Sequence, residues 1–236
     1  MNESGVSYHS HHYFIGKRLK KSDSNKIKNV QDNILRNNEY INLDNKINNI
    51  YSPFIYLGYF KDDIENKLKN ITMPLFFALG EQLSPLKVYL NGYTLSSQSS
   101  RFKYLALNYE DKNDLIEKVV IPYLKKKFDS YTGVNLTYEK TPIIPLFRLN
   151  NKQQKNFLAN NKNIKKDING KTYDFFTDLK LPQAKFDKSV QKRYYEFDSI
   201  ELLRATPVKI KKGKKSFNEQ LQIDTLFSIP LGGNLN

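Results

Sequence analysis

The fold is decided by a stretch in the first third of the chain, Ser52-Pro53-Phe54-Ile55-Tyr56-Leu57-Gly58-Tyr59-Phe60. Apolar and aromatic residues follow one another there almost without a break, which is typical of a buried strand. A second stretch has the same character, Pro142-Ile143-Ile144-Pro145-Leu146-Phe147-Arg148-Leu149. The order strand with proline, helix, strand occurs twice along the chain. We therefore expect an α+β protein with two lobes and antiparallel sheets around a central groove.

Helices are predicted between these strands. The first carries Ile27, Val30 and Ile34 on one face, and one of the polar residues 22–24 caps it. A short helix is predicted over residues 62–71, and a long one over residues 111–131 with Pro122 kinking or splitting it. The other predicted strands are 13–19, 75–79, 86–90, 101–109, 194–211 and 216–231, with a turn at Asn91-Gly92.

Domain boundaries are expected only near the ends of the chain. Residues 1–12 are polar and predict a flexible N-terminal arm, and residues 232–236 predict a tail. One two-lobed domain is expected over residues 13–231, with a polar insertion at about 150–190. A chain of 236 residues can bury a large core without covalent staples.

Composition excludes several kinds of site. Cysteine is absent, so disulfides, thiolate metal sites and cysteine nucleophiles are excluded. The three histidines, His9, His11 and His12, fall in the predicted arm, where no rigid framework would hold a metal. We expect no metal and no cofactor.

The chain also lacks the usual signals for membranes and secretion. It has no run of about 18 apolar residues, and its first residues lack the apolar core of a signal peptide. We expect no membrane partner and a place inside the host cell, in its cytoplasm, or in a virion.

The layout resembles the 2H phosphoesterase superfamily, the LigT-like and cyclic phosphodiesterase-like fold. Its members carry two strands with the pattern Pro-His-hydrophobic-Thr-hydrophobic, which face each other across a groove. The resemblance covers about residues 13–231 in order and pattern, with Pro53–Phe60 and Pro142–Leu149 matching the two motif strands. It implies a phosphodiester site in which two histidines act as general base and general acid.

The motif positions depart from the family pattern. Phe54 and Ile143 match the two histidines, and Tyr56 and Pro145 match the two threonines. Phenylalanine and isoleucine have no titratable group, and proline lacks even a backbone N–H. These four positions are therefore interpreted as vestigial, and the chain is expected to have no catalytic residue and not to be an enzyme.

Net charge is +14, which favours a polyanionic partner. Of the 38 basic residues 32 are lysine, so an AT-rich genome is an alternative explanation for the charge. Arginine, which suits bidentate phosphate and base recognition, is scarce. The candidate nucleic-acid-binding residues are Lys17, Arg18, Lys20, Lys21, Lys209, Lys211, Lys212, Lys214 and Lys215.

Three hypotheses for function remain. The first is a non-catalytic structural or assembly protein, such as a connector or tail-associated virion component of an AT-rich phage or virus. Its partners would be other subunits, contacted through Tyr173, Phe175 and Phe176 in the polar insertion. The second is a non-catalytic RNA- or DNA-binding module that uses the basic clusters. The third is a phosphodiesterase with displaced catalytic residues.

Overall fold

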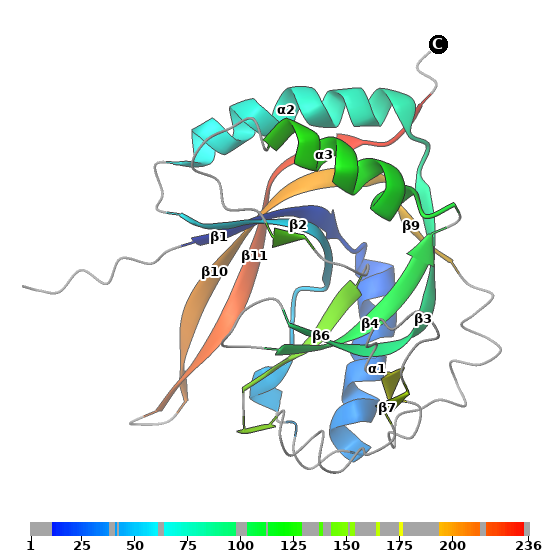
Figure 1. Ribbon diagram of the computed structural model, residues 1–236. Coiled ribbons are helices and arrows are strands. Elements are labelled where there is room, and N and C mark those ends of the chain that lie inside the picture. The colour runs from blue at the N-terminus through cyan, green and yellow to red at the C-terminus, as the bar shows by residue number, and fades with distance from the viewer. Residues whose placement is uncertain are drawn as a thin grey trace, which may run out of the picture.

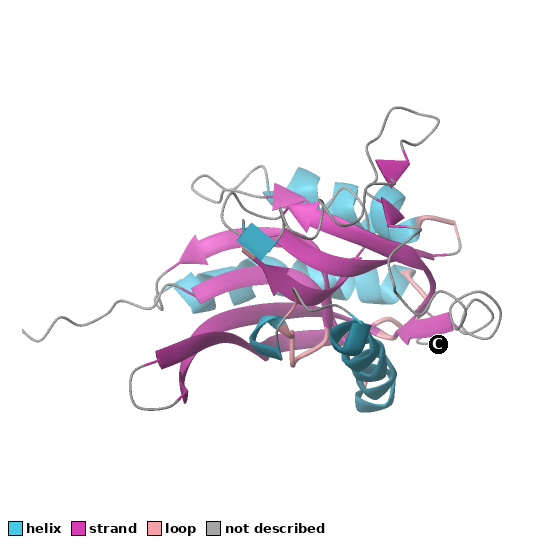
Figure 2. Ribbon diagram, turned by 90° about the horizontal axis from the view of Figure 1, so that it is seen from below, coloured by secondary structure: helices cyan, strands magenta, loops and turns pink. Residues whose placement is uncertain are grey.

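Two antiparallel sheets form the body of the protein in the computed structural model (Figure 1). Seen at right angles, the strands lie between the helices (Figure 2). The predicted α+β class with antiparallel sheets is confirmed. The structure describes residues 11–37, 41, 43–60, 64–97, 103–111, 113–128, 137–138, 143–150, 152–153, 164–165, 175–176, 194–212 and 216–233.

The first sheet, called sheet A here, has the strand order β11-β10-β1-β2-β5. Its neighbouring strands are all antiparallel. β10 and β11 continue past the end of β1 as a two-stranded ribbon that leaves the body (Figure 1), because β1 pairs only with residues 201–205 of β10. The strands are β1 (His11–Arg18), β2 (Tyr51–Phe60), β5 (Thr137–Tyr138), β10 (Ser199–Lys212) and β11 (Ser216–Pro230).

The second sheet, sheet B, has the strand order β6-β4-β3-β9 and is also antiparallel. Its strands are β3 (Leu86–Ser97), β4 (Lys103–Asp111), β6 (Ile143–Leu149) and β9 (Tyr194–Phe197). The two sheets come together where the loop before β2 pairs with β6, through a bridge between Lys46 and Phe147. A small separate sheet pairs β7 (Ile164–Lys165) with β8 (Phe175–Phe176).

Helices cover the outer side of each sheet. α1 (Lys21–Asn37) packs on sheet B, where the buried Gln31 side chain donates hydrogen bonds to the carbonyls of Leu146 and Ile47 at 2.8 and 2.9 Å. α2 (Glu65–Gln82) packs on β10 and β11 of sheet A. A π-helical turn (Ile116–Val120) leads into α3 (Ile121–Phe128), so the helix predicted over residues 111–131 changes geometry just before Pro122. A 3-10 turn, η1 (Leu43–Asn45), precedes β2.

The structure corrects three predicted elements. Residues 75–79 are helical, because Leu75, Phe76 and Leu79 extend the buried stripe of Leu68 and Ile71 along α2. Asn91-Gly92 does not end a strand: β3 runs through it as a bulge, with Gly92 at φ 92°.

The third correction concerns residues 194–211, which are two strands in different sheets, separated at Asp198. The chain also enters β1 at His11, inside the segment predicted to be a flexible arm, while residues 1–10 lie outside the described part. Most of the predicted insertion at 150–190 lies outside it too.

Buried apolar residues form two separate cores. The larger one joins all three α-helices to the strand faces beneath them. The smaller one contains no helix residue and joins residues of both sheets. We call the strand faces turned away from the helices the inter-sheet face.

Candidate active site on the inter-sheet face

An aromatic cluster occupies the inter-sheet face where the two sheets meet. Phe14 of β1 lies 4.9 Å from Tyr51 and 5.8 Å from Tyr56, both of β2, measured between ring centroids. Tyr104 of β4 belongs to the same cluster, so the cluster bridges sheet A to sheet B. All four rings are at most 9% exposed. The remaining buried members are Ile47, Leu203, Ala205 and Ile223.

A bulge in β2 decides which of its residues reach this face. Gly16 of β1 pairs with Pro53, and Ile15 pairs with Ile55, so Phe54 is the extra residue. Phe54 and Ile55 both lie in the helix-covered core, with the Phe54 ring 6.1 Å from that of Phe197. Tyr56 therefore faces the other sheet and Phe54 does not, so the residues matched to the first motif histidine and threonine lie on different faces of β2.

On β6 the two positions that were matched to the family motif do share the inter-sheet side. Ile143 is opposite Asn108 and Pro145 is opposite Ala106, and these β4 residues alternate with core residues such as Leu107. Asn108 is 3% exposed and its Oδ1 has no hydrogen-bond partner. An acceptor without a donor at this place leaves one polar group that a ligand could satisfy.

His12 is the functional candidate that sequence reasoning missed. Its ring is stacked on Tyr56 at 5.0 Å with an interplanar angle of 21°. Burial lowers its pKa from 6.5 to about 4, so the imidazole is neutral at pH 7. The alternation of His12 and Phe14 could have placed it on the strand, but the polar residues before it led to the arm assignment.

His11 lies on the opposite side of β1. Its Nδ1 is 2.9 Å from Thr206 Oγ1, within hydrogen-bonding distance. Neighbouring residues of a strand point to opposite faces. His11 and His12 therefore form a natural pair for comparison, with only His12 on the inter-sheet face.

A pocket lies at one end of the inter-sheet face, where the loop before β2 bridges the sheets. Arg148 of β6 is one of the lining residues, and Asn45 Nδ2 donates a hydrogen bond to the Arg148 carbonyl at 2.8 Å. Lys46 adds a second cation, paired with Asp32 at 2.5 Å. Because Asp32 neutralises Lys46 in part, the positive charge that could attract an anionic group to this pocket comes from Arg148. The lining residues are Asp44, Asn45, Lys46, Ile47, Asn48, Arg148 and Leu221.

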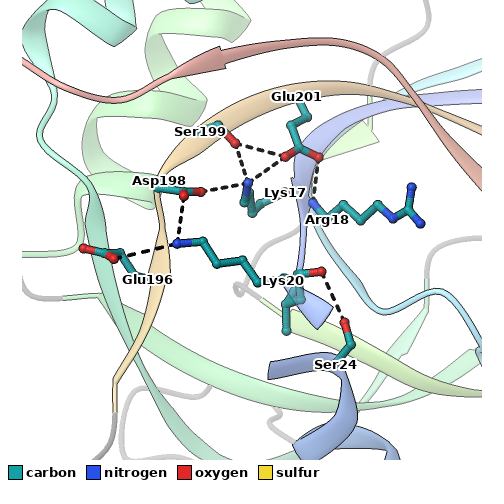
Figure 3. Close-up of polar contacts among 9 residues, drawn as sticks. Lys17, Arg18, Lys20, Ser24, Glu196, Asp198, Ser199 and Glu201 are labelled. Atoms are coloured by element: carbon teal, nitrogen blue, oxygen red, sulfur yellow. Dashed lines mark hydrogen bonds and ion pairs between the residues drawn. The ribbon is translucent and has the colours of Figure 1, made fainter. Parts of the chain in front are cut away.

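Lys17, one of the predicted nucleic-acid contacts, is buried in a polar network instead (Figure 3). It is 5% exposed and lies 2.7 Å from Glu201 Oε1 and 3.0 Å from Asp198 Oδ1. It also donates a hydrogen bond to Ser199 Oγ. A cation held by two carboxylates under the surface cannot reach a phosphate, so Lys17 joins β1 to β10.

Lys20 extends the same network at the surface. It pairs with Asp198 at 2.8 Å and with Glu196 at 4.0 Å (Figure 3). Burial alone would raise the pKa of Asp198, but the hydrogen bonds and charges of Lys20 and Lys17 hold that pKa below its ordinary value. Lys20 is therefore already neutralised in part.

The remaining predicted contacts are spread over the molecule. Arg18 and Lys21 are exposed beside this network. Lys209, Lys211 and Lys212 lie on the part of β10 that forms the ribbon, while Lys214 and Lys215 lie outside the described residues. Phe175 and Phe176 form β8, and Tyr173 lies outside the described residues.

Neither a candidate metal site nor a candidate membrane-spanning helix is found in the described part of the chain. No group of three or more histidine, aspartate or glutamate side chains there could hold a metal ion. None of the helices in that part of the chain is long and apolar enough to cross a membrane.

Comparison with known proteins gives matches at the level of structure. TT0787 of Thermus thermophilus superposes with a TM-score of 0.52 at 13% identity, covering 94% of this chain and 98% of that one. E. coli LigT complexed with phosphate superposes with a TM-score of 0.44 at 11% sequence identity, and the match covers 95% of this chain and 99% of LigT. A protein described as a phosphoesterase superposes with a TM-score of 0.46 at 12% sequence identity, and the match covers 94% of this chain and 99% of that one. No family model and no curated protein sequence matches.

These comparisons correct the expectation that the chain is not an enzyme. The proteins matched over nearly the whole chain include LigT and a protein described as a phosphoesterase. The expectation rested on four substituted positions, and Phe54 is not on the inter-sheet face at all. At these identities the likeness shows the fold, and the chemistry has to be argued from the residues on that face.

Proposed function

We propose that the protein is a phosphoesterase that cleaves a phosphodiester with groups displaced from the family's histidine positions. The observation that carries the proposal is His12, an imidazole stacked on Tyr56 on the inter-sheet face of a phosphoesterase fold. The proposed roles are a general base for His12 and a phosphate ligand for Arg148.

His12 has the protonation state that a general base needs. Its pKa of about 4 leaves the ring neutral and able to accept a proton at pH 7. A base with so low a pKa is weak, but a bound phosphate changes its surroundings. An anion nearby favours the imidazolium form and raises the pKa toward neutrality. Substrate binding would thus strengthen the base.

Arg148 supplies the fixed positive charge. It stands opposite Tyr104 of the aromatic cluster and lines the pocket between the sheets. A guanidinium group binds phosphate oxygens through two parallel hydrogen bonds and stabilises the negative charge that develops during displacement.

The test is hydrolysis of a 2′,3′-cyclic mononucleotide by the purified full chain, followed by separation of the product. We expect turnover by the wild type and a loss of roughly 100-fold or more in His12→Phe, which keeps an aromatic ring on Tyr56. Arg148→Met should lose activity as well. His11→Phe is the matched control, because that side chain faces away, and it should retain activity.

The proposal fails if the wild type shows no turnover, or if His11→Phe and His12→Phe are equally active. Hydrolysis that all variants retain would come from a contaminant or from another site on the chain.

Contact with nucleic acid through the basic clusters is a second proposal. It is supported by the net charge of +14 and by the ribbon of β10 and β11, which carries Lys209, Lys211 and Lys212 away from the body (Figure 1). Assembly with other subunits remains a hypothesis that native mass by light scattering would test. Nothing in the structure or the comparisons supports a virion role.

A further inference from the structure

An aromatic pair with one exposed and one partly buried ring lies on sheet B at the edge away from the aromatic cluster. Tyr89 of β3 and Tyr194 of β9 are direct cross-strand partners, with ring centroids 6.2 Å apart and planes at 60°. Lys87 Nζ lies 4.6 Å from the centre of the Tyr194 ring. Tyr194 is 48% exposed, so about half of this side chain is open to solvent.

The pair belongs to the inter-sheet face. Val88, Leu90 and Tyr195 lie in the helix-covered core, so their strand neighbours Tyr89 and Tyr194 point to the other side. Tyr89 is opposite Glu110 of β4, two residues from Asn108 on the same side of that strand. One continuous face therefore runs from the candidate active site to this aromatic pair.

The two ends of this face are far apart. Tyr104, opposite Arg148, and Glu110, opposite Tyr89, are six residues apart on β4. At about 3.3 Å per residue this is roughly 20 Å. A single nucleotide cannot span that distance, but a chain of several nucleotides can.

The chemistry of the pair selects among ligands. Tyrosine rings beside a lysine combine a stacking surface with a phosphate contact, the combination found where proteins hold single-stranded nucleic acid. On the same side Glu110, opposite Tyr89, is exposed, and Glu196, opposite Lys87, is partly exposed. Because carboxylates repel phosphate groups, ring stacking on a base is the main attraction that this surface offers to a strand.

We propose that Tyr89, Tyr194 and Lys87 form a stacking platform for a base of single-stranded nucleic acid whose backbone continues to the candidate active site. This inference rests on the proposed phosphoesterase function and specifies its substrate as a polymer. Tyr194 stacks on the base, and Lys87 contacts the adjoining phosphate.

The experiment measures the affinity of the full chain for a fluorescently labelled single-stranded homopolymer and for an abasic strand of equal length. We expect tighter binding of the base-bearing strand. Tyr194→Ala should weaken that binding between about fivefold and a hundredfold and leave the abasic strand unaffected. Tyr194→Phe, which keeps the ring, should bind like the wild type.

Phe77→Ala is the matched control, because Phe77 is 51% exposed but lies on α2. It should change neither affinity. Lys87→Met should weaken the binding of both strands. Lys67→Met, at an exposed position on α2, should weaken the binding of neither.

Two results would overturn the platform. One is equal affinity of the wild type for base-bearing and abasic strands. The other is a loss in Tyr194→Phe as large as in Tyr194→Ala. Hydrolysis of a cyclic mononucleotide should be unchanged in Tyr194→Ala. Base-dependent binding of strands without any hydrolysis would therefore contradict only the proposed phosphoesterase function. Hydrolysis without base-dependent binding would contradict only the stacking platform.

Discussion

His12 makes the stability of the fold depend on pH. Its pKa is about 4 in the folded protein, because burial disfavours the charged ring, and 6.5 in the unfolded chain. Below pH 6.5 the unfolded state takes up a proton that the folded state does not. Stability contributed by neutral His12 is therefore complete above pH 6.5 and is lost as the pH falls toward 4.

We expect the wild type to lose on the order of 2 kcal/mol between pH 7 and pH 4.5 from this residue. Urea denaturation at several pH values measures the loss. Carboxylates also respond at the acidic end, so the comparison is with His12→Phe, which should show a shallower decline between pH 6.5 and 5. Identical declines in the two proteins would mean that folding does not lower the pKa of His12.

At the residue scale, the sequence predicted helices and strands better than it predicted which residues lie on the inter-sheet face. Ile143 and Pro145 lie on the inter-sheet side as the motif match implies, but Phe54 does not. Regular alternation along a strand would place Phe54 and Tyr56 on one face. The bulge that separates them forms against Gly16, a residue distant in sequence, so no pattern within the strand predicts it.

At the scale of elements, the junction of β1 and β2 depends on Gly16. A Cβ atom at this position would lie 2.1 Å from the carbonyl oxygen of Ser52 and 3.0 Å from Cα of Pro53. Both atoms belong to backbone, so the strands would have to move apart. We expect Gly16→Ala to destabilise the fold by roughly 3 kcal/mol, and to disturb the bulge that turns Tyr56 toward the other sheet.

Gly232→Ala is the control, since nothing lies within 4 Å of a Cβ atom there. It should stay within about 0.5 kcal/mol of the wild type. Urea midpoints of the two variants give the comparison. Equal midpoints would show that the strands separate at little cost and that the close approach at Gly16 is not required.

Long apolar runs predicted elements well, and the short run at residues 75–79 did not. β2 and β6 were predicted from their continuous apolar residues, and α1 from its spacing. Residues 75–79 are too short an apolar run to distinguish a strand from the end of a helix. In the structure they form part of α2, which packs on β11. The break between β9 and β10 falls at Asp198, whose partners Lys17 and Lys20 are distant in sequence, so the local pattern did not predict it.

For the molecule as a whole, the net charge of +14 could attract nucleic acid either as a diffuse field or through one particular surface. The ribbon of β10 and β11 concentrates lysines where two strands leave the body (Figure 1). If its lysines contact phosphates, each one removed should lower the salt dependence of binding. For single strands the slope of log K against log salt changes by about 0.7 per contact.

We expect replacement of Lys209, Lys211 and Lys212 by glutamine to reduce this slope by about 2 for a single-stranded oligonucleotide, titrated between about 50 and 200 mM salt. Replacement of Lys125, Lys126 and Lys127, at the end of α3, removes the same charge from another part of the molecule. That control should leave the slope nearly unchanged. Equal reductions in both triple variants would show that net charge, and not the ribbon, attracts the strand. The ribbon would then be only an extended edge of sheet A.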